Sequence, residues 1–210
     1  MSENETKQKI LSVATELFSR HGFEGASIRE IAREAGVNLA AVNYHFQNKL
    51  NLYYKVMDSN CERMEKDIAE LAVDEPSVET LTQRIFDYFI ERRHEMMNSF
   101  KVILTETDTP QVIEQMPEGR IGPPGGEVLL AAIERQVGDK ATNAAKVWAT
   151  RSIFNQITHL SLIVSSTWIR QHCASMEVFE ESYQKKTFKH VVKSFLDHIQ
   201  SEEWEKIESV

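Results

Sequence analysis

Residues 27–46 read Ser-Ile-Arg-Glu-Ile-Ala-Arg-Glu-Ala-Gly-Val-Asn-Leu-Ala-Ala-Val-Asn-Tyr-His-Phe, and this stretch decides the fold of the amino-terminal part of the chain. The pattern predicts two short helices joined by a tight turn. Ser27 and Glu30 have the spacing of a capping box, in which each side chain accepts a hydrogen bond from the other residue's backbone amide. Asn38 is a favourable N-cap for the second helix, and Gly36 falls at the turn between the two helices.

Both predicted helices carry apolar residues at helical spacing. The stripes are formed by Ile28, Ile31, Ala32 and Ala35 in the first helix and by Val42 and Phe46 in the second. Small residues where the two helices cross allow close packing. This is the layout of a helix-turn-helix, whose second helix is shaped to enter the major groove of DNA.

The flanking residues extend the pattern. Upstream lie Ile10, Leu11, Ala14, Leu17 and Phe18 and then the run 20–26, and downstream lie His45 to Lys49 and Leu52. From about Lys7 to Met57 the chain resembles the amino-terminal DNA-binding domain of TetR-family transcriptional regulators. It departs from the family pattern at Ala40, where glycine is usual, and at Asn43, where tyrosine is usual. The resemblance implies that the remainder is a helical domain that binds an effector and forms a dimer.

The composition of the chain agrees with an all-α protein. Its 210 residues include only 5 Pro and 8 Gly, and they contain no long apolar alternation of period two. The net charge is -8, yet residues 1–57 contain seven Lys and Arg against six Glu, so the acidity lies in the rest of the chain. A locally basic surface on an acidic body is suited to binding DNA at a few specific sites.

We predict two domains from these patterns. Residues 1–48 form a three-helix DNA-binding domain, and residues 49–210 form a larger helical domain for ligand binding and dimerisation, entered by a linking helix over about 49–72. Apolar periodicity and stop signals predict the remaining helices over about 5–21, 77–94, 95–107, 127–137, 140–173 and 178–201.

The last two predicted helices are long and apolar on more than one face. A helix of this kind needs neighbours on two sides. One side can pack on the domain core, and the other most simply meets a second copy of the chain across a twofold axis. We therefore predict a homodimer through these helices, although a larger core within one chain would explain the same pattern.

Position along the second short helix predicts which side chains meet DNA. We expect the residues that face base edges to be Asn38, Leu39, Ala40, Ala41 and Asn43, and those that meet phosphate to be Ser27, Arg29, Tyr44, His45 and Lys49. The start of a helix offers free amides and a positive dipole end, which suits phosphate. The alternatives are that Tyr44 packs on the core and that His45 is a structural cap, and Ser27 caps its helix in either case.

The middle helices supply candidate effector contacts. These are Phe86, Phe89, Phe100, Ile103, Leu104, Trp148, Arg151, Asn155 and His159, which combine aromatic walls with a few polar groups. The aromatic residues could equally belong to an ordinary core. Arg151 could meet an anionic effector or could pair with an acidic side chain of the protein.

The sequence predicts no enzyme, metal site or cofactor. It contains no nucleophile elbow, zinc-binding H-E-x-x-H or phosphate-binding loop motif. Cys61 and Cys173 are isolated, which favours free thiols in a reducing compartment over a redox or metal site. The polar amino terminus and the absence of an apolar span predict a cytoplasmic protein without a membrane segment. A DNA-binding repressor released by a small molecule is the favoured function, while an activator and a sequence-tolerant chromosome-binding or protein-interaction module stay open.

Overall fold

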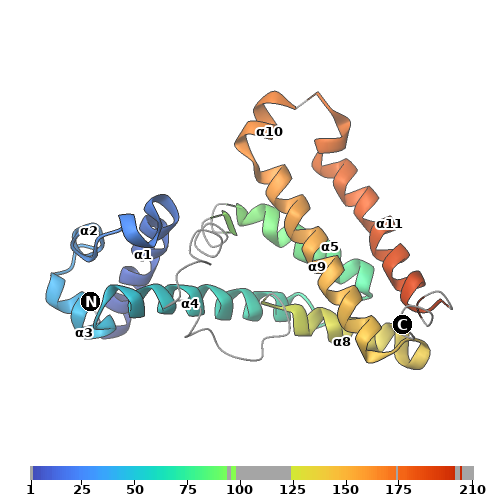
Figure 1. Cartoon of the computed structure of the whole chain (residues 1–210), viewed down its shortest axis with the longest axis horizontal. Helices are drawn as coiled ribbons and strands as arrows, with labels where there is room; N and C mark the ends of the chain where they lie inside the picture. Colours follow the sequence, from blue (N-terminus) through green and yellow to red (C-terminus); the bar gives the residue numbers. More distant parts are fainter. Residues whose placement is uncertain (1, 94–95, 98–123, 174, 202–203, 205–210) are drawn as a thin grey trace. The chain divides into compact units, whose positions relative to one another are not determined.

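The computed structural model describes residues 2–93, 96–97, 124–173, 175–201 and 204, and in these residues all regular structure is helical (Figure 1). The chain divides into two compact units. Of the described residues, the first contains 2–63 and 96–97, and the second contains 64–93, 124–173, 175–201 and 204. The predicted all-α architecture is therefore confirmed for the described residues.

The first unit is built from α1 (Glu3–Gly25), α2 (Ile28–Glu34), α3 (Leu39–Phe46) and the first part of α4 (Lys49–Glu70). Ser2 and Glu5 form a capping box at the start of α1, where the Ser2 amide donates to Glu5 Oε2 at 2.7 Å and Glu5 N donates to Ser2 Oγ at 3.3 Å. The stop predicted at Gly22 is seen as a kink within α1, because Gly22 has φ 69° and leaves the helical conformation.

The core of the first unit is formed by the inner faces of these four helices. Its buried residues are Ile10, Leu11, Ala14, Leu17, Phe18, Ala26, Ile31, Ala32, Ala35, Val42, Phe46, Leu52, Tyr53 and Val56. Since helices of seven or eight residues are unstable alone in water, this shared core holds α2 and α3 in place.

The second unit contains the end of α4, then α5 (Val78–Glu91), α8 (Gly126–Val137), α9 (Asn143–Ser165), α10 (Thr167–His172) and α11 (Glu181–Ile199), with short 3-10 turns at Gly138–Lys140 and Glu177–Phe179. Helix α9 packs against α5, α8 and α11, and it runs beside α11 (Figure 1). The buried side chains of α9 include Ala145, Ala149, Ile153, Phe154 and Ile157.

Polar contacts fasten the end of α4 to α5 within the second unit. The Tyr88 hydroxyl donates to Asp67 at 2.8 Å. The Arg84 guanidinium donates to the Leu71 carbonyl at 2.8 Å and to Asp74 Oδ2 at 2.8 Å. The hydrogen bond from Arg84 holds the pKa of the Asp74 carboxyl below its usual value. These contacts fix the position of the last turns of α4 on α5.

One of the predicted helices needs correction. The single helix expected over 140–173 is two helices, because the chain leaves the helical conformation at Ser166 (ψ 122°), which is the C-cap of α9 and whose hydroxyl caps α10. Serine competes with the helical backbone for hydrogen bonds and favours caps. The first of these helices also starts at Asn143, where Thr142 provides the cap. The helix expected over 95–107 lies almost wholly outside the described residues.

Gly125, immediately before α8, gives a stability prediction with a matched control. Its φ is 84°, and a Cβ added there would lie 2.5 Å from Ile68 Cδ1, whereas Gly138 has φ 59° and open space within 4 Å of the corresponding Cβ position. Gly138→Ala should therefore cost only backbone strain, about 1 kcal/mol. Gly125→Ala should cost roughly 2–5 kcal/mol, because overpacking against Ile68 is added to the strain.

Chemical denaturation of the two variants measures this difference. Equal losses of unfolding free energy in Gly125→Ala and Gly138→Ala would contradict the close approach of Gly125 to α4.

In the described part of the chain, no helix is both long and apolar enough to cross a membrane.

Candidate nucleic-acid interface

The turn between α2 and α3 is set by local hydrogen bonds. Gly36 adopts φ 62°, a left-handed conformation that glycine tolerates best. Beyond it, the Val37 amide donates to the Ala32 carbonyl at 3.0 Å. Asn38 caps α3 as predicted, with its Oδ1 accepting from the Ala41 amide at 2.7 Å. The start of α3 is therefore fixed by its own sequence.

Helix α3 has one buried face and one open face. Val42 is 0% exposed and Phe46 is 3% exposed, so these two side chains anchor the helix on the core. On the other side Leu39 is 38% exposed and Tyr44 is 75% exposed. The residues predicted to face base edges lie here, with Asn38, Leu39, Ala40 and Asn43 exposed and Ala41 half-buried.

The structure decides between the two alternatives for Tyr44, which were a place on the open surface and a place in the core. Tyr44 does not pack on the core, since its side chain is largely exposed. His45 is half-buried, and its ring centroid lies 5.2 Å from that of Tyr44 and 6.0 Å from that of Phe46. These contacts leave both side chains at the edge of the open face.

The capping box predicted for Ser27 and Glu30 is wrong. Ser27 occupies the N-cap position of α2, but its hydroxyl makes no capping hydrogen bond. The Glu30 carboxylate instead lies 3.6 Å from the Arg33 guanidinium, one turn further along α2. Ser27 and Arg29 are both exposed, so their side chains are open to a ligand.

Lys49 is held by two contacts from the last turn of α1. Its Nζ donates to the Glu24 carbonyl at 3.1 Å and lies 4.5 Å from the centroid of the Phe23 ring. Phe23 is not among the functional residues predicted from the sequence. The available signal for its role was an aromatic residue directly after Gly22. Its partner Lys49 lies too far away in the sequence for a local pattern to indicate the contact.

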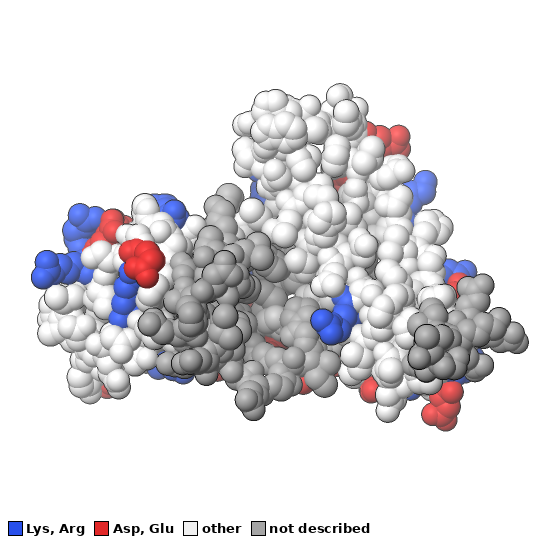
Figure 2. Space-filling model, in the orientation of Figure 1, with Lys and Arg blue, Asp and Glu red and all other residues white. Residues whose placement is uncertain are grey.

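Charge is unevenly distributed over the surface. Figure 2 shows Lys and Arg side chains, with acidic ones between them, on the visible surface of the unit that contains α1, α2 and α3. The cationic side chains of this unit suit phosphate. The open face of α3 carries both polar and apolar side chains, and the same unit carries exposed cationic side chains. This combination is typical of a helix-turn-helix DNA-binding domain.

Comparison with known proteins identifies the family of this domain. Residues 10–55 match the family of bacterial regulatory proteins called the tetR family. The chain is 33% identical over 99 residues to the probable HTH-type transcriptional regulator YttP of Bacillus subtilis, covering 45% of this chain and 48% of that protein. The domain formed by residues 10–55 thus belongs to the tetR family of bacterial regulatory proteins.

Two further curated relatives match mainly the DNA-binding region. The regulator AcrR of Shigella flexneri is 40% identical over 70 residues (33% of this chain, 31% of that protein). The repressor AcnR of Corynebacterium diphtheriae is 34% identical over 64 residues (30% of this chain, 34% of that protein). The chain spans less than half the length of these three curated relatives.

Solved structures extend the likeness in fold to the rest of the chain. A tetR-family transcriptional regulator from Streptomyces coelicolor has a TM-score of 0.62 at 17% identity, covering 100% of this chain and 87% of that chain. A transcriptional regulator from Aquifex aeolicus has a TM-score of 0.54 at 20% identity, covering 90% and 98%. These values show a shared fold.

The predicted effector contacts that the structure describes fall into a buried pair on α5 and a set exposed on α9. Phe86 and Phe89 are buried core residues of α5, with ring centroids 6.3 Å from Phe188 and 6.1 Å from Phe154 respectively. Phe100, Ile103 and Leu104 lie outside the described residues. Arg151, Asn155 and His159 are exposed on α9. The inner face of that helix carries Ala145, Ala149, Ile153, Phe154 and Ile157 instead.

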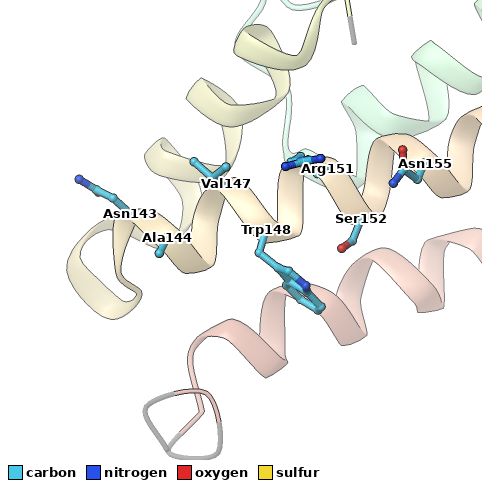
Figure 3. A pocket seen from close by; sticks show the side chains of 7 residues that line it. All are labelled: Asn143, Ala144, Val147, Trp148, Arg151, Ser152 and Asn155. Atoms are coloured by element: carbon cyan, nitrogen blue, oxygen red, sulfur yellow. The ribbon is translucent and has the colours of Figure 1, made fainter. Parts of the chain in front are cut away.

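The exposed face of α9 is hollowed. A depression of about 590 Å³ is lined by Asn143, Ala144, Val147, Trp148, Arg151, Ser152 and Asn155. All seven belong to α9, and Figure 3 shows Trp148 pointing toward α11 while Arg151 lies on the side of α8. Trp148 packs on Phe195 and Trp204, with ring centroids 5.4 Å and 4.8 Å away. Because one helix supplies the whole lining, this is an open surface and not an enclosed ligand cavity.

Proposed function

We propose that the protein is a homodimeric repressor that binds a palindromic DNA operator and is released from it by a small molecule. The observation that carries the proposal is the open face of α3, where Leu39, Ala40, Asn43 and Tyr44 are exposed. Val42 and Phe46 fix the opposite face to the core. The named relatives are all transcription regulators, and AcnR is called a repressor. They also support our proposal that the protein acts in the cytoplasm by binding and not by catalysis.

Each exposed side chain of α3 has a proposed role in reading DNA. Leu39, Ala40 and Ala41 are apolar and suit the methyl groups of thymine, and Asn43 can form a pair of hydrogen bonds with adenine. We assign the surrounding polar groups to phosphate, and these are Ser27, Arg29, Tyr44, His45 and Lys49. Phosphate contacts would fix the register of α3 in the groove, while base contacts would select the sequence.

The proposed dimer contact is the outer surface of α9 together with α11. Val191 and Phe195 of α11 and Leu162 and Ile163 of α9 are half-buried apolar residues, and Trp148 is 37% exposed. Covering these side chains with a second copy would remove apolar surface from water. A twofold dimer would then present two α3 helices to successive turns of the major groove, about 34–36 Å apart.

Helix α4 provides a connection by which an effector could act. It is one helix from Lys49 to Glu70, it starts in the unit of α3, and it ends in the other unit, where it is bonded to α5. An effector bound by the second unit that shifts the end of α4 would change the separation of the two DNA-binding units. By linkage, the effector and the operator would each weaken the binding of the other.

Selection of bound duplexes from a random pool tests the proposed function. We expect enrichment of a palindrome whose half-sites are about one helical turn apart. Recovery of duplexes without a common sequence would instead assign the protein to sequence-tolerant chromosome binding. Failure to retain any duplex at low salt would favour a protein-interaction module.

Asn43→Ala should change sequence preference more than overall affinity. If Asn43 contacts a base, its loss removes about 1–3 kcal/mol of discrimination at one position of each half-site. Arg29→Ala is the matched control, because the loss of a phosphate contact should weaken binding to all sequences alike. Titration of both variants against the operator and its single-base variants measures the difference. A uniform loss of affinity in Asn43→Ala would assign Asn43 to the DNA backbone.

A further inference from the structure

Lys49 is more constrained than a surface lysine usually is. Its side chain is half-buried, and its ammonium group contacts both the Glu24 carbonyl at 3.1 Å and the face of the Phe23 ring at 4.5 Å. A carbonyl bond and a ring contact from adjacent residues act on the same nitrogen. Together they restrict a side chain that otherwise has many rotamers.

The Phe23 ring is itself fixed from two sides. It stacks on Phe18 with centroids 6.3 Å apart, and its edge contact with Tyr53 has a centroid distance of 5.3 Å. Phe18 and Tyr53 are both 1% exposed. Since Tyr53 lies one turn after Lys49 on α4, the ring is held against the same face of α4 that carries the lysine.

Lys49 is also well placed in the chain to meet DNA. It follows the end of α3 at Phe46 by three residues and begins α4. An ammonium group has three hydrogen-bond donors, and the Glu24 carbonyl uses one of them. Two donors are therefore left for an anionic oxygen, while the bond to Glu24 and the ring contact stay in place.

We propose that Phe23 is a positioning residue for DNA binding, which holds the Lys49 ammonium where it meets a phosphate. This inference rests on the proposed operator binding. A flexible lysine would lose rotamer freedom when it binds phosphate. Here the two contacts of the Lys49 ammonium, with the Glu24 carbonyl and the Phe23 ring, already fix the side chain when the protein folds, and we call these two contacts the clasp. Pre-organisation of this kind strengthens binding without adding a contact to the DNA.

A double-mutant cycle on operator affinity tests the proposal. Dissociation constants are measured at several salt concentrations for wild type, Phe23→Leu, Lys49→Met and the double variant, with Phe23→Tyr as a control that keeps the ring. Phe23→Leu should weaken binding about two- to fivefold, the range expected for an exposed cation–π contact, and should keep the salt slope. Lys49→Met should weaken binding and lower the salt slope by about one.

The coupling between the two positions decides the result. In the Lys49→Met background, Phe23→Leu should cause no further loss, and Phe23→Tyr should match wild type. The same fold-loss from Phe23→Leu in both backgrounds would overturn the proposal, because the ring would then act only through the core. Thermal unfolding of each free variant separates this outcome from loss of the folded state.

A measurement on the free wild-type protein keeps the test decisive if Phe23→Leu does not fold. The face of an aromatic ring shifts nearby protons upfield, so the Lys49 ε protons should show ring-current shifts in NMR spectra. Random-coil shifts for these protons would overturn the clasp. Failure of wild type to bind any duplex would count against the proposed function and not against the contact of Lys49 with Phe23.

Discussion

Asn155→Lys is expected to convert the protein from a dimer to a monomer and to weaken operator binding by roughly 10²–10⁴-fold. Asn155 lies near the middle of α9, is exposed, and lines the depression that contains Trp148. A lysine there would stand one turn from Arg151 and, in a twofold contact, would bring the same new charge from both copies. Because the position is exposed on a helix, the single chain should still fold.

Sedimentation equilibrium and operator titration measure the two parts of this result. Ala131→Lys is the control, since it adds the same charge at an exposed position of α8, a helix that is not part of the proposed dimer surface. It should stay dimeric and bind with wild-type affinity. If Asn155→Lys also stays dimeric, the outer surface of α9 is not the dimer contact, and the apolar faces of α9 and α11 need another explanation.

Ala40→Glu is expected to abolish operator binding while leaving the fold intact. Ala40 is the second residue of α3 and is exposed. A carboxylate in the first turn of a helix interacts favourably with the helix dipole, so α3 should form at least as well as in wild type. Within a major groove, the same carboxylate would meet base acceptors and phosphates. A like-charge contact of this kind costs several kcal/mol, or roughly a hundredfold or more in Kd.

The control for this prediction is Ala131→Glu, which makes the same substitution on an exposed face of α8. Both variants gain one negative charge, so a general electrostatic effect would weaken them equally. Circular dichroism and thermal unfolding should show both variants folded like wild type. Operator binding by Ala40→Glu at near-wild-type affinity would mean that the open face of α3 does not enter the groove.

The helix-turn-helix could be predicted from sequence because its signals are local. The cap at Asn38, the turn at Gly36 and the apolar anchors Val42 and Phe46 lie close together in the chain, and all have the predicted roles. Ser27 is the exception, since it sits at the N-cap without capping. The spacing of Ser27 and Glu30 is that of a capping box. The Glu30 carboxylate instead forms an ion pair with Arg33, which lies one turn further along α2.

The second unit could be predicted less well, because periodicity does not tell which side of a helix is buried when both are apolar. In α9 the aliphatic face with Ile153 and Ile157 is buried, and this leaves Arg151, Asn155 and His159 on the surface. In the clasp of Lys49 by Phe23 and Glu24, the hydrogen bond joins Lys49 to Glu24, which lies 25 positions earlier in the chain. Contacts of this range depend on how α1 and α4 pack, which no local pattern specifies.

The most direct test of the central claim is the binding of the purified protein to its selected palindrome and to a scrambled duplex of equal composition, at near-physiological salt. We predict that two protomers bind each palindrome, with an affinity at least about 10³-fold above that for the scrambled duplex. Equal affinities for the two duplexes, or a single protomer on each, would contradict reading of paired half-sites by α3.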